Sequence, residues 1–122
     1  MAFHREDPTD YLPLTPVVLH ILLALADEER HGYGIMLEIA NRTGGSFRPG
    51  SGTLYGTLKR LLSSGLAEES GERPAPDLDD SRRRYYRLTK LGRRVLQAEL
   101  KRLEQVVGVG RMKKLLPRSA ST

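Results

Sequence analysis

The stretch "SGTLYGTLKRLLSSGL" (residues 51–66) reads as a helix that carries two glycines in its first half. Each glycine inside a helix costs about 1 kcal/mol relative to alanine. On a helical wheel the leucines gather in one sector, and Gly52 and Gly56 lie opposite them beside Lys59 and Arg60. This opposite face has no acid before Glu68, whereas a solvated helix face normally mixes lysine with glutamate. The pattern therefore predicts a small, basic face that another molecule approaches.

A phosphate backbone suits this face. Small residues, hydroxyl groups and free backbone N–H groups at the start of a helix bind phosphates. Ser51, interpreted as the helix cap, and Thr53 supply these groups, while Lys59 and Arg60 supply charge. Tyr55 lies on the flank. Because tyrosine has an apolar body and a polar tip, it can fill a gap beside the neighbouring strands, donate a hydrogen bond to a phosphate, or do both.

Two helices are expected before this one. Thr15 can cap the first, with Pro16 at its first helical position. That helix has almost no polar face, which predicts burial on several sides or an oligomer contact. A second helix begins near Tyr33 and ends at Gly44. We interpret His31 as its cap in preference to a phosphate contact.

After Gly65 the pattern changes to two short strands, "LAEES" (66–70) and "RRRYYRL" (82–88), with "GERPAPDLDDS" (71–81) as the loop between them. A last helix spans 89–112 and is capped by Thr89. The order predicts a mainly α fold with a small β-hairpin, a winged helix-turn-helix. The leucines of the last helix recur at heptad spacing, which favours a C-terminal dimerisation helix. We divide the chain into an N-terminal tail (1–11), the winged-helix domain (12–88), the dimerisation helix (89–112) and a basic flexible tail (113–122).

The hairpin carries three consecutive arginines, Arg82, Arg83 and Arg84, directly after an acidic patch. One interpretation is that at least one arginine contacts a neighbouring groove or phosphate of the nucleic acid. The other is local pairing with the aspartates, which contributes little when exposed. The aspartates concerned are Asp77, Asp79 and Asp80.

Composition narrows the class of protein. The chain has 122 residues, no cysteine and a net charge of +5, which fits one domain in a reducing cytoplasm. The polar N-terminus is not a signal peptide, and no apolar run is long enough for a membrane span. Residues 82–122 hold thirteen basic and two acidic residues. That distribution suggests a polyanion partner, although a solvated surface with a basic tail would give the same count.

Catalysis and metal binding are not expected. The three histidines are scattered and have no cysteine partners, which does not match metal-ligand spacing. Ser51 has no local histidine, and "GSFRPGSG" (45–52) lacks the lysine of a phosphate-binding loop. We therefore assign no catalytic residue, no metal and no cofactor.

Three motifs together resemble the PadR-like family of winged-helix transcriptional regulators: "HGYGI" (31–35), "GTLYGTLKRL" (52–61) and "YYRLTKLG" (85–92). The resemblance runs from about Leu12 to the last helix and matches the short group with one C-terminal helix. It implies a homodimer on double-stranded DNA, usually a repressor. Some short members bind a small-molecule effector near the dimer interface, and no motif here marks one.

The resemblance also implies site residues. On the helix, those expected near DNA are Thr53, Tyr55, Gly56, Lys59 and Arg60, and on the wing Arg82, Arg83 and Arg84. Ser51 is added to them because it lies at the start of the same helix, where backbone N–H groups bind phosphates. The expected dimer residues are Leu19, Leu22 and Leu23 of the first helix and Leu96, Leu100, Leu103 and Val107 of the last, which recur at heptad spacing. The alternative is a dimeric winged-helix module that binds a protein partner without reading DNA. RNA binding ranks last, because no exposed aromatic platform is apparent.

Overall fold

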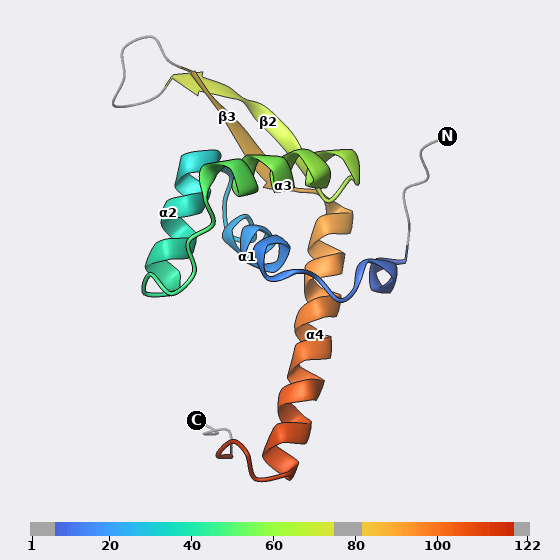
Figure 1. Cartoon of the computed structure of the whole chain (residues 1–122). Helices are drawn as coiled ribbons and strands as arrows, with labels where there is room; N and C mark the ends of the chain where they lie inside the picture. The colour runs from blue at the N-terminus through green and yellow to red at the C-terminus, as the bar shows by residue number, and fades with distance from the viewer. Residues whose placement is uncertain (1–6, 75–81, 119–122) are drawn as a thin grey trace.

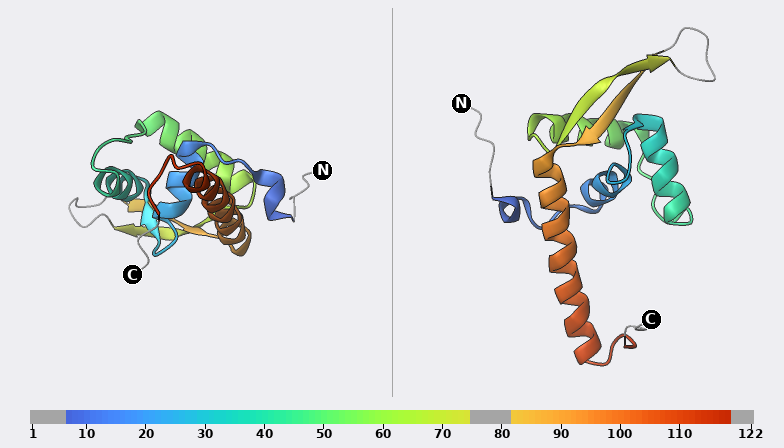
Figure 2. Two further views of the ribbon diagram at one scale, coloured as in Figure 1. Left: turned by 90° about the horizontal axis from the view of Figure 1, so that it is seen from below. Right: turned by 180° about the vertical axis from the view of Figure 1, so that it is seen from behind.

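The computed structural model describes residues 7–74 and 82–118 (Figure 1). It confirms a mainly helical fold with a small antiparallel sheet. The helices α1 to α3 form a bundle, the β2–β3 hairpin projects above α3, and the long α4 runs away from the bundle (Figure 2). The elements in chain order are η1 (Pro8–Tyr11), α1 (Pro16–Ala24), β1 (Arg30–His31), α2 (Gly32–Arg42), α3 (Ser51–Ser63), β2 (Ala67–Pro74), β3 (Arg82–Leu88) and α4 (Lys90–Met112).

Side-chain caps begin three of the four α-helices where the sequence predicts them. Thr15 accepts the Val18 N–H at 3.3 Å and Thr89 accepts the Gly92 N–H at 2.9 Å. The Nδ1 atom of His31 accepts the Gly34 N–H at 2.9 Å, so His31 is the cap of α2. The prediction for α3 is wrong: Gly50 is the N-cap, no side chain caps the helix, and Ser51 is the first helical residue. The start of α3 therefore keeps its backbone N–H groups exposed to partners.

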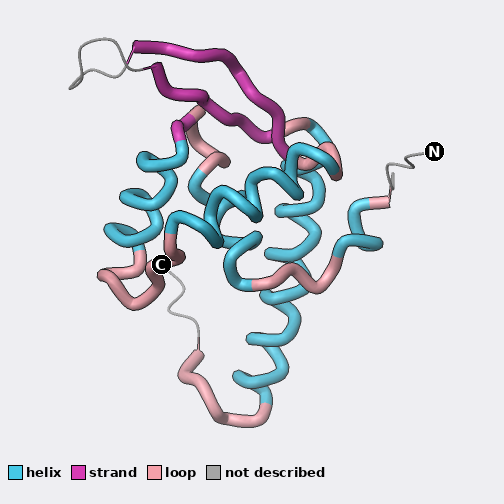
Figure 3. Tube along the Cα trace, turned by 45° about the horizontal axis from the view of Figure 1, so that its top comes forward, coloured by secondary structure: helices cyan, strands magenta, loops and turns pink. Residues whose placement is uncertain are grey.

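The sheet has three strands in the order β1-β3-β2, where the sequence predicted only a hairpin (Figure 3). The short β1 pairs Arg30 with Tyr86 of β3. The β2 strand continues to Pro74, past the predicted end at Ser70. A bulge interrupts its register between Glu69 and Gly71, and Gly71 has a φ of 116°, a conformation that favours glycine. The wing is thus longer than predicted, and its tip, with all three aspartates, lies outside the described residues.

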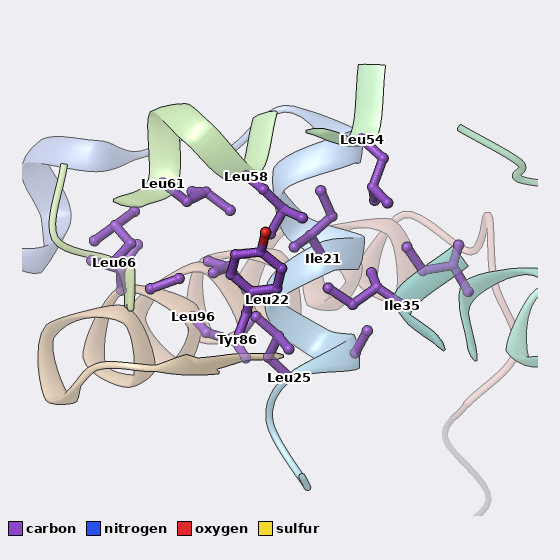
Figure 4. Packing of buried hydrophobic residues seen from close by; sticks show 14 residues of the cluster. Ile21, Leu22, Leu25, Ile35, Leu54, Leu58, Leu61, Leu66, Tyr86 and Leu96 are labelled. Carbon is purple, nitrogen blue, oxygen red and sulfur yellow. The ribbon is translucent and has the colours of Figure 1, made fainter. Parts of the chain in front are cut away.

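The core lies between α1, α3 and α4, with Tyr86 of β3 at its centre (Figure 4). The helices α1 to α4 each contribute aliphatic side chains to it. Ile21, Leu22 and Ala24 of α1 are buried, which is one of the two outcomes that the sequence left open for this helix. Leu22 and Leu96, expected in a dimer interface, are 0% and 4% exposed within the protomer. They are core residues and present no surface to a partner.

A compact connection ties the end of α3 to the start of α4. The Thr89 hydroxyl donates to the Gly65 carbonyl oxygen at 2.6 Å, and the Thr89 N–H donates to the Leu66 carbonyl oxygen at 3.2 Å. Gly92 is buried against that same carbonyl group. We call Gly65, Leu66, Thr89 and Gly92 the α3–α4 joint.

A buried carboxylate holds the N-terminal segment. Glu99 of α4 is 1% exposed and accepts the Leu14 N–H at 2.8 Å. The guanidinium of Arg102, one turn further along α4, also donates to this carboxylate. The η1 helix, which the sequence placed in a tail, packs against α4 beside this site. In the described part of the chain, no helix is long and apolar enough to cross a membrane.

Candidate nucleic-acid interface

The outward face of α3 is polar and basic. The leucines Leu54, Leu58 and Leu61 point into the core. The other side exposes Ser51, Gly52, Thr53, Tyr55, Lys59 and Arg60, with Gly56 half-buried. No acidic residue occurs anywhere in α3. Because carboxylates would repel phosphates, this face suits an anionic partner.

The two glycines of α3 are not required by packing within the protomer. A β carbon built on Gly52 or on Gly56 would meet no heavy atom of the described residues within 4 Å. The space outside both positions is open. Among the described residues, no close neighbour therefore explains the cost of these glycines to helix stability.

The two basic side chains of α3 differ in how they are held. The Arg60 guanidinium donates to the Thr57 hydroxyl at 3.2 Å, and that hydroxyl donates to the Thr53 carbonyl oxygen at 2.7 Å. This chain of bonds keeps Arg60 along the helix. Within residues 7–74 and 82–118, no hydrogen bond or ion pair holds the Lys59 ammonium group. Lys59 can therefore turn toward a phosphate at little cost.

Tyr55 lies between α2 and the wing. Its side chain is half-exposed, and its ring tip packs against Gly32 of α2. It lines a small cavity of about 220 Å³ together with Tyr33, Arg84 and Tyr86. Burial raises the pKa of the Tyr86 hydroxyl, and the neighbouring Glu69 and Tyr55 raise it further. Tyr55 therefore fills a gap between α2 and the wing, while part of its side chain stays exposed.

The wing arginines are paired in a way that the sequence did not predict. Arg84 lies 3.5 Å from Glu69 and 3.5 Å from Glu72, both on β2. A guanidinium nitrogen of Arg83 lies 2.9 Å from Nε2 of His31. The backbone of Arg82 pairs with Pro74 at the far end of the hairpin. The glutamates of β2 thus neutralise Arg84, while the predicted pairing with Asp77, Asp79 and Asp80 falls outside the described residues.

Two residues beside the site had no assigned role in the sequence analysis. Tyr33, in the first turn of α2, is 50% exposed and shares the cavity with Tyr55. Gly32 forms the surface on which the Tyr55 ring rests. Both belong to the motif "HGYGI". In that motif a tyrosine lies between two glycines, and this pattern could have identified the two residues as part of the site.

From Leu100 onward, α4 exposes several apolar side chains, which point in different directions around the helix. The exposed apolar residues are Leu100, Val106, Val109 and Met112. The helix continues without a break through Gly108 and Gly110. Leu103 and Val107 are half-buried, as are Leu19 and Leu23 of α1. Single exposed aliphatic residues are ordinary, whereas a large contiguous apolar patch typically marks an interface. Among the described residues, no group of three His, Cys, Asp or Glu side chains could hold a metal ion.

The sequence of this chain is similar to those of known transcriptional regulators. The model of the transcriptional regulator PadR-like family matches residues 21–98. Transcriptional regulator Rv3488 of Mycobacterium tuberculosis is 39% identical over 90 residues, which cover 74% of this chain and 78% of that protein. An uncharacterised protein of Lysinibacillus sphaericus is 35% identical over 94 residues, covering 76% of this chain and 80% of that protein.

Solved structures share the fold. Bacillus subtilis PadR, determined in complex with operator DNA, superposes with a TM-score of 0.62 at 23% identity. The match covers 72% of this chain and 48% of that one. At this identity the likeness concerns the fold alone.

Proposed function

Because this chain belongs to the PadR-like family of transcriptional regulators, we propose that it binds double-stranded DNA as a homodimer and reads it with α3. The observation that carries the proposal is the acid-free outward face of α3, which combines open glycine positions with Lys59 and Arg60. A helix of this kind enters the major groove in helix-turn-helix proteins. The B. subtilis PadR complex supports it as well, since the same fold there holds operator DNA. A cytoplasmic location fits this role.

The wing is the second element in the proposal. Arg83 and Arg84 flank the same cavity as Tyr55, so the hairpin and α3 border one surface. Exposed pairs such as Arg84 with Glu69 are weak, and a phosphate can replace the glutamate as the partner of the arginine. We propose that α3 contacts the groove and that the wing arginines contact the backbone beside it.

The double substitution Lys59→Ala with Arg60→Ala tests the reading face. We expect the affinity for a labelled duplex of the promoter upstream of its own gene to fall about 30-fold or more in fluorescence anisotropy, because two charge contacts are lost. The dependence of log affinity on log salt should flatten by about two. The fold should not change, since both side chains are exposed.

The matched control is Lys113→Ala with Arg118→Ala, which removes the same charge from exposed positions far from α3. We expect this variant to bind the duplex nearly as well as the original protein. Equal losses in both double variants would show that total charge, and not the α3 face, governs binding. If the original protein does not bind duplex DNA at low salt, the protein-binding alternative is favoured.

Dimerisation through α4 rests on its exposed apolar side chains. We expect Leu100→Asp with Val106→Asp to convert the dimer into a monomer at micromolar concentration, since both side chains are exposed and a carboxylate in an apolar interface is costly. Size-exclusion chromatography with light scattering measures the mass. A matched change at the exposed Leu37 of α2, Leu37→Asp, should leave the mass unchanged. A protein that is already monomeric would contradict the proposal.

Repression and release by a small-molecule effector complete the proposal, and both rest on the family resemblance. A dimer seated on a promoter would exclude the transcription machinery, which makes repression the simplest consequence of binding. A reporter gene behind the native promoter should be more active in the absence of the protein.

A further inference from the structure

Gly32 and Tyr55 pack against each other across the contact between α2 and α3. Gly32 is the first residue of α2 and is buried. A β carbon at this position would lie 2.5 Å from Cζ and 2.6 Å from Cε1 of Tyr55, and would overlap the hydroxyl oxygen. The ring tip of Tyr55 therefore occupies the space that a side chain at residue 32 would need.

This packing is what fixes the Tyr55 ring. Within residues 7–74 and 82–118, no hydrogen bond holds the Tyr55 hydroxyl, and about half of the side chain is exposed. An exposed aromatic ring without a hydrogen bond takes its direction from the surfaces that it touches. One of those surfaces is the backbone of Gly32, and Tyr86 of β3 lines the same cavity.

We propose that Gly32 is a positioning residue for DNA binding: it leaves the space into which the tip of the Tyr55 ring packs, and so holds the exposed part of the ring beside the DNA-facing side of α3. The inference rests on the proposed DNA binding. It gives the first glycine of the "HGYGI" motif a role in recognition. Gly32 itself touches no DNA in this account and acts through Tyr55.

The glycine is not required by the backbone. Gly32 is not among the glycines with positive φ, so alanine can adopt its conformation. Alanine also has the higher helix propensity. The atoms that its β carbon would meet belong to the end of a flexible side chain and not to a backbone. The expected response to Gly32→Ala is therefore that the fold stays and the ring of Tyr55 turns away.

The test is a double-mutant cycle with Gly32→Ala, Tyr55→Ala and the combination, measured by anisotropy on the same promoter duplex. We expect each single variant to lose about tenfold in affinity, the range of one specific contact. The combined variant should bind no more weakly than Tyr55→Ala alone, since no ring remains to be displaced. The melting temperature of the combined variant should equal or exceed that of Tyr55→Ala.

A second readout needs no DNA. The Tyr55 ring should shift the Gly32 Hα resonances in the NMR spectrum, and Tyr55→Ala should remove that shift. Independent, additive losses of affinity would overturn the inference, as would a Gly32→Ala variant that binds like the original protein. If the Lys59 and Arg60 double variant loses affinity but Tyr55→Ala binds DNA normally, the proposed DNA binding is supported and the proposed role of Gly32 is wrong. If nothing binds DNA, the proposed function fails and the recognition role of Gly32 fails with it, while a Gly32 shift that depends on Tyr55 would still show the packing.

Discussion

Gly92→Ala should destabilise the protein by more than about 3 kcal/mol, the largest effect that we expect from any single methyl group in this chain. Its β carbon would overlap the Leu66 carbonyl oxygen and lie 2.9 Å from the carbonyl carbon. These are backbone atoms, and the same oxygen accepts the Thr89 N–H. Relief would require α4 to move away from the end of α3, which would disrupt the joint and the core beneath it.

Urea denaturation followed by circular dichroism measures this effect. Because small domains have only about 5–15 kcal/mol of stability, the Gly92 variant should unfold at much lower urea or fail to fold. Gly52→Ala is the matched control, since its β carbon meets nothing within 4 Å. That variant should be as stable as the original protein or up to about 1 kcal/mol more stable. Equal midpoints for the two variants would contradict the packing at the joint.

Glu99→Ala should cost about 2–3 kcal/mol of unfolding free energy. The substitution leaves the Leu14 N–H without its acceptor and opens a cavity in a buried site. It also detaches the segment before α1 from α4, so η1 should become sensitive to protease. Glu99→Gln keeps an acceptor oxygen and most of the volume, and should lose less.

The contribution of Glu99 should depend on pH. Hydrogen bonds from Arg102 and from the Leu14 N–H hold the pKa of this carboxyl below its ordinary value. A carboxyl with a lower pKa in the folded state stabilises the fold above its unfolded pKa, and this contribution is lost as the pH falls through the folded pKa. The stability difference between the original protein and Glu99→Gln should therefore be larger at pH 7 than at pH 3. A difference that is the same at both values would contradict this account.

The helices and most of their caps were predictable because their signals are local. Thr15, His31 and Thr89 each lie three residues before the N–H that they accept, so the sequence alone places them. The prediction that Ser51 caps α3 is wrong because a serine at a helix start usually caps the helix, whereas Gly50 is the N-cap here. The two-residue β1 strand could not be predicted, because it exists only through its pairing with β3.

In the candidate site, too, the features with local sequence signals were predictable, and those that depend on contacts between distant segments were not. The outward face of α3 follows from helical periodicity, which needs no knowledge of other elements. The contact between Gly32 and Tyr55 joins two helices, and the bond from Leu14 to Glu99 spans most of the chain. The burial of Leu22 and Leu96 within the protomer likewise depends on where α4 crosses α1. Heptad spacing cannot distinguish a seam that faces a partner from one that faces the chain's own core.

In the proposed dimer, the α3–α4 joint determines how the position of α3 depends on the position of α4. Thr89 and Gly92 both contact the backbone of Gly65 and Leu66, and these contacts link the end of α3 to the start of α4. If two copies pair along α4, the angle at which the two α4 helices cross sets the distance between the two α3 helices. A few degrees of change at the far end of α4 would alter the spacing of half-sites that the dimer can span, with no rearrangement inside the winged helix.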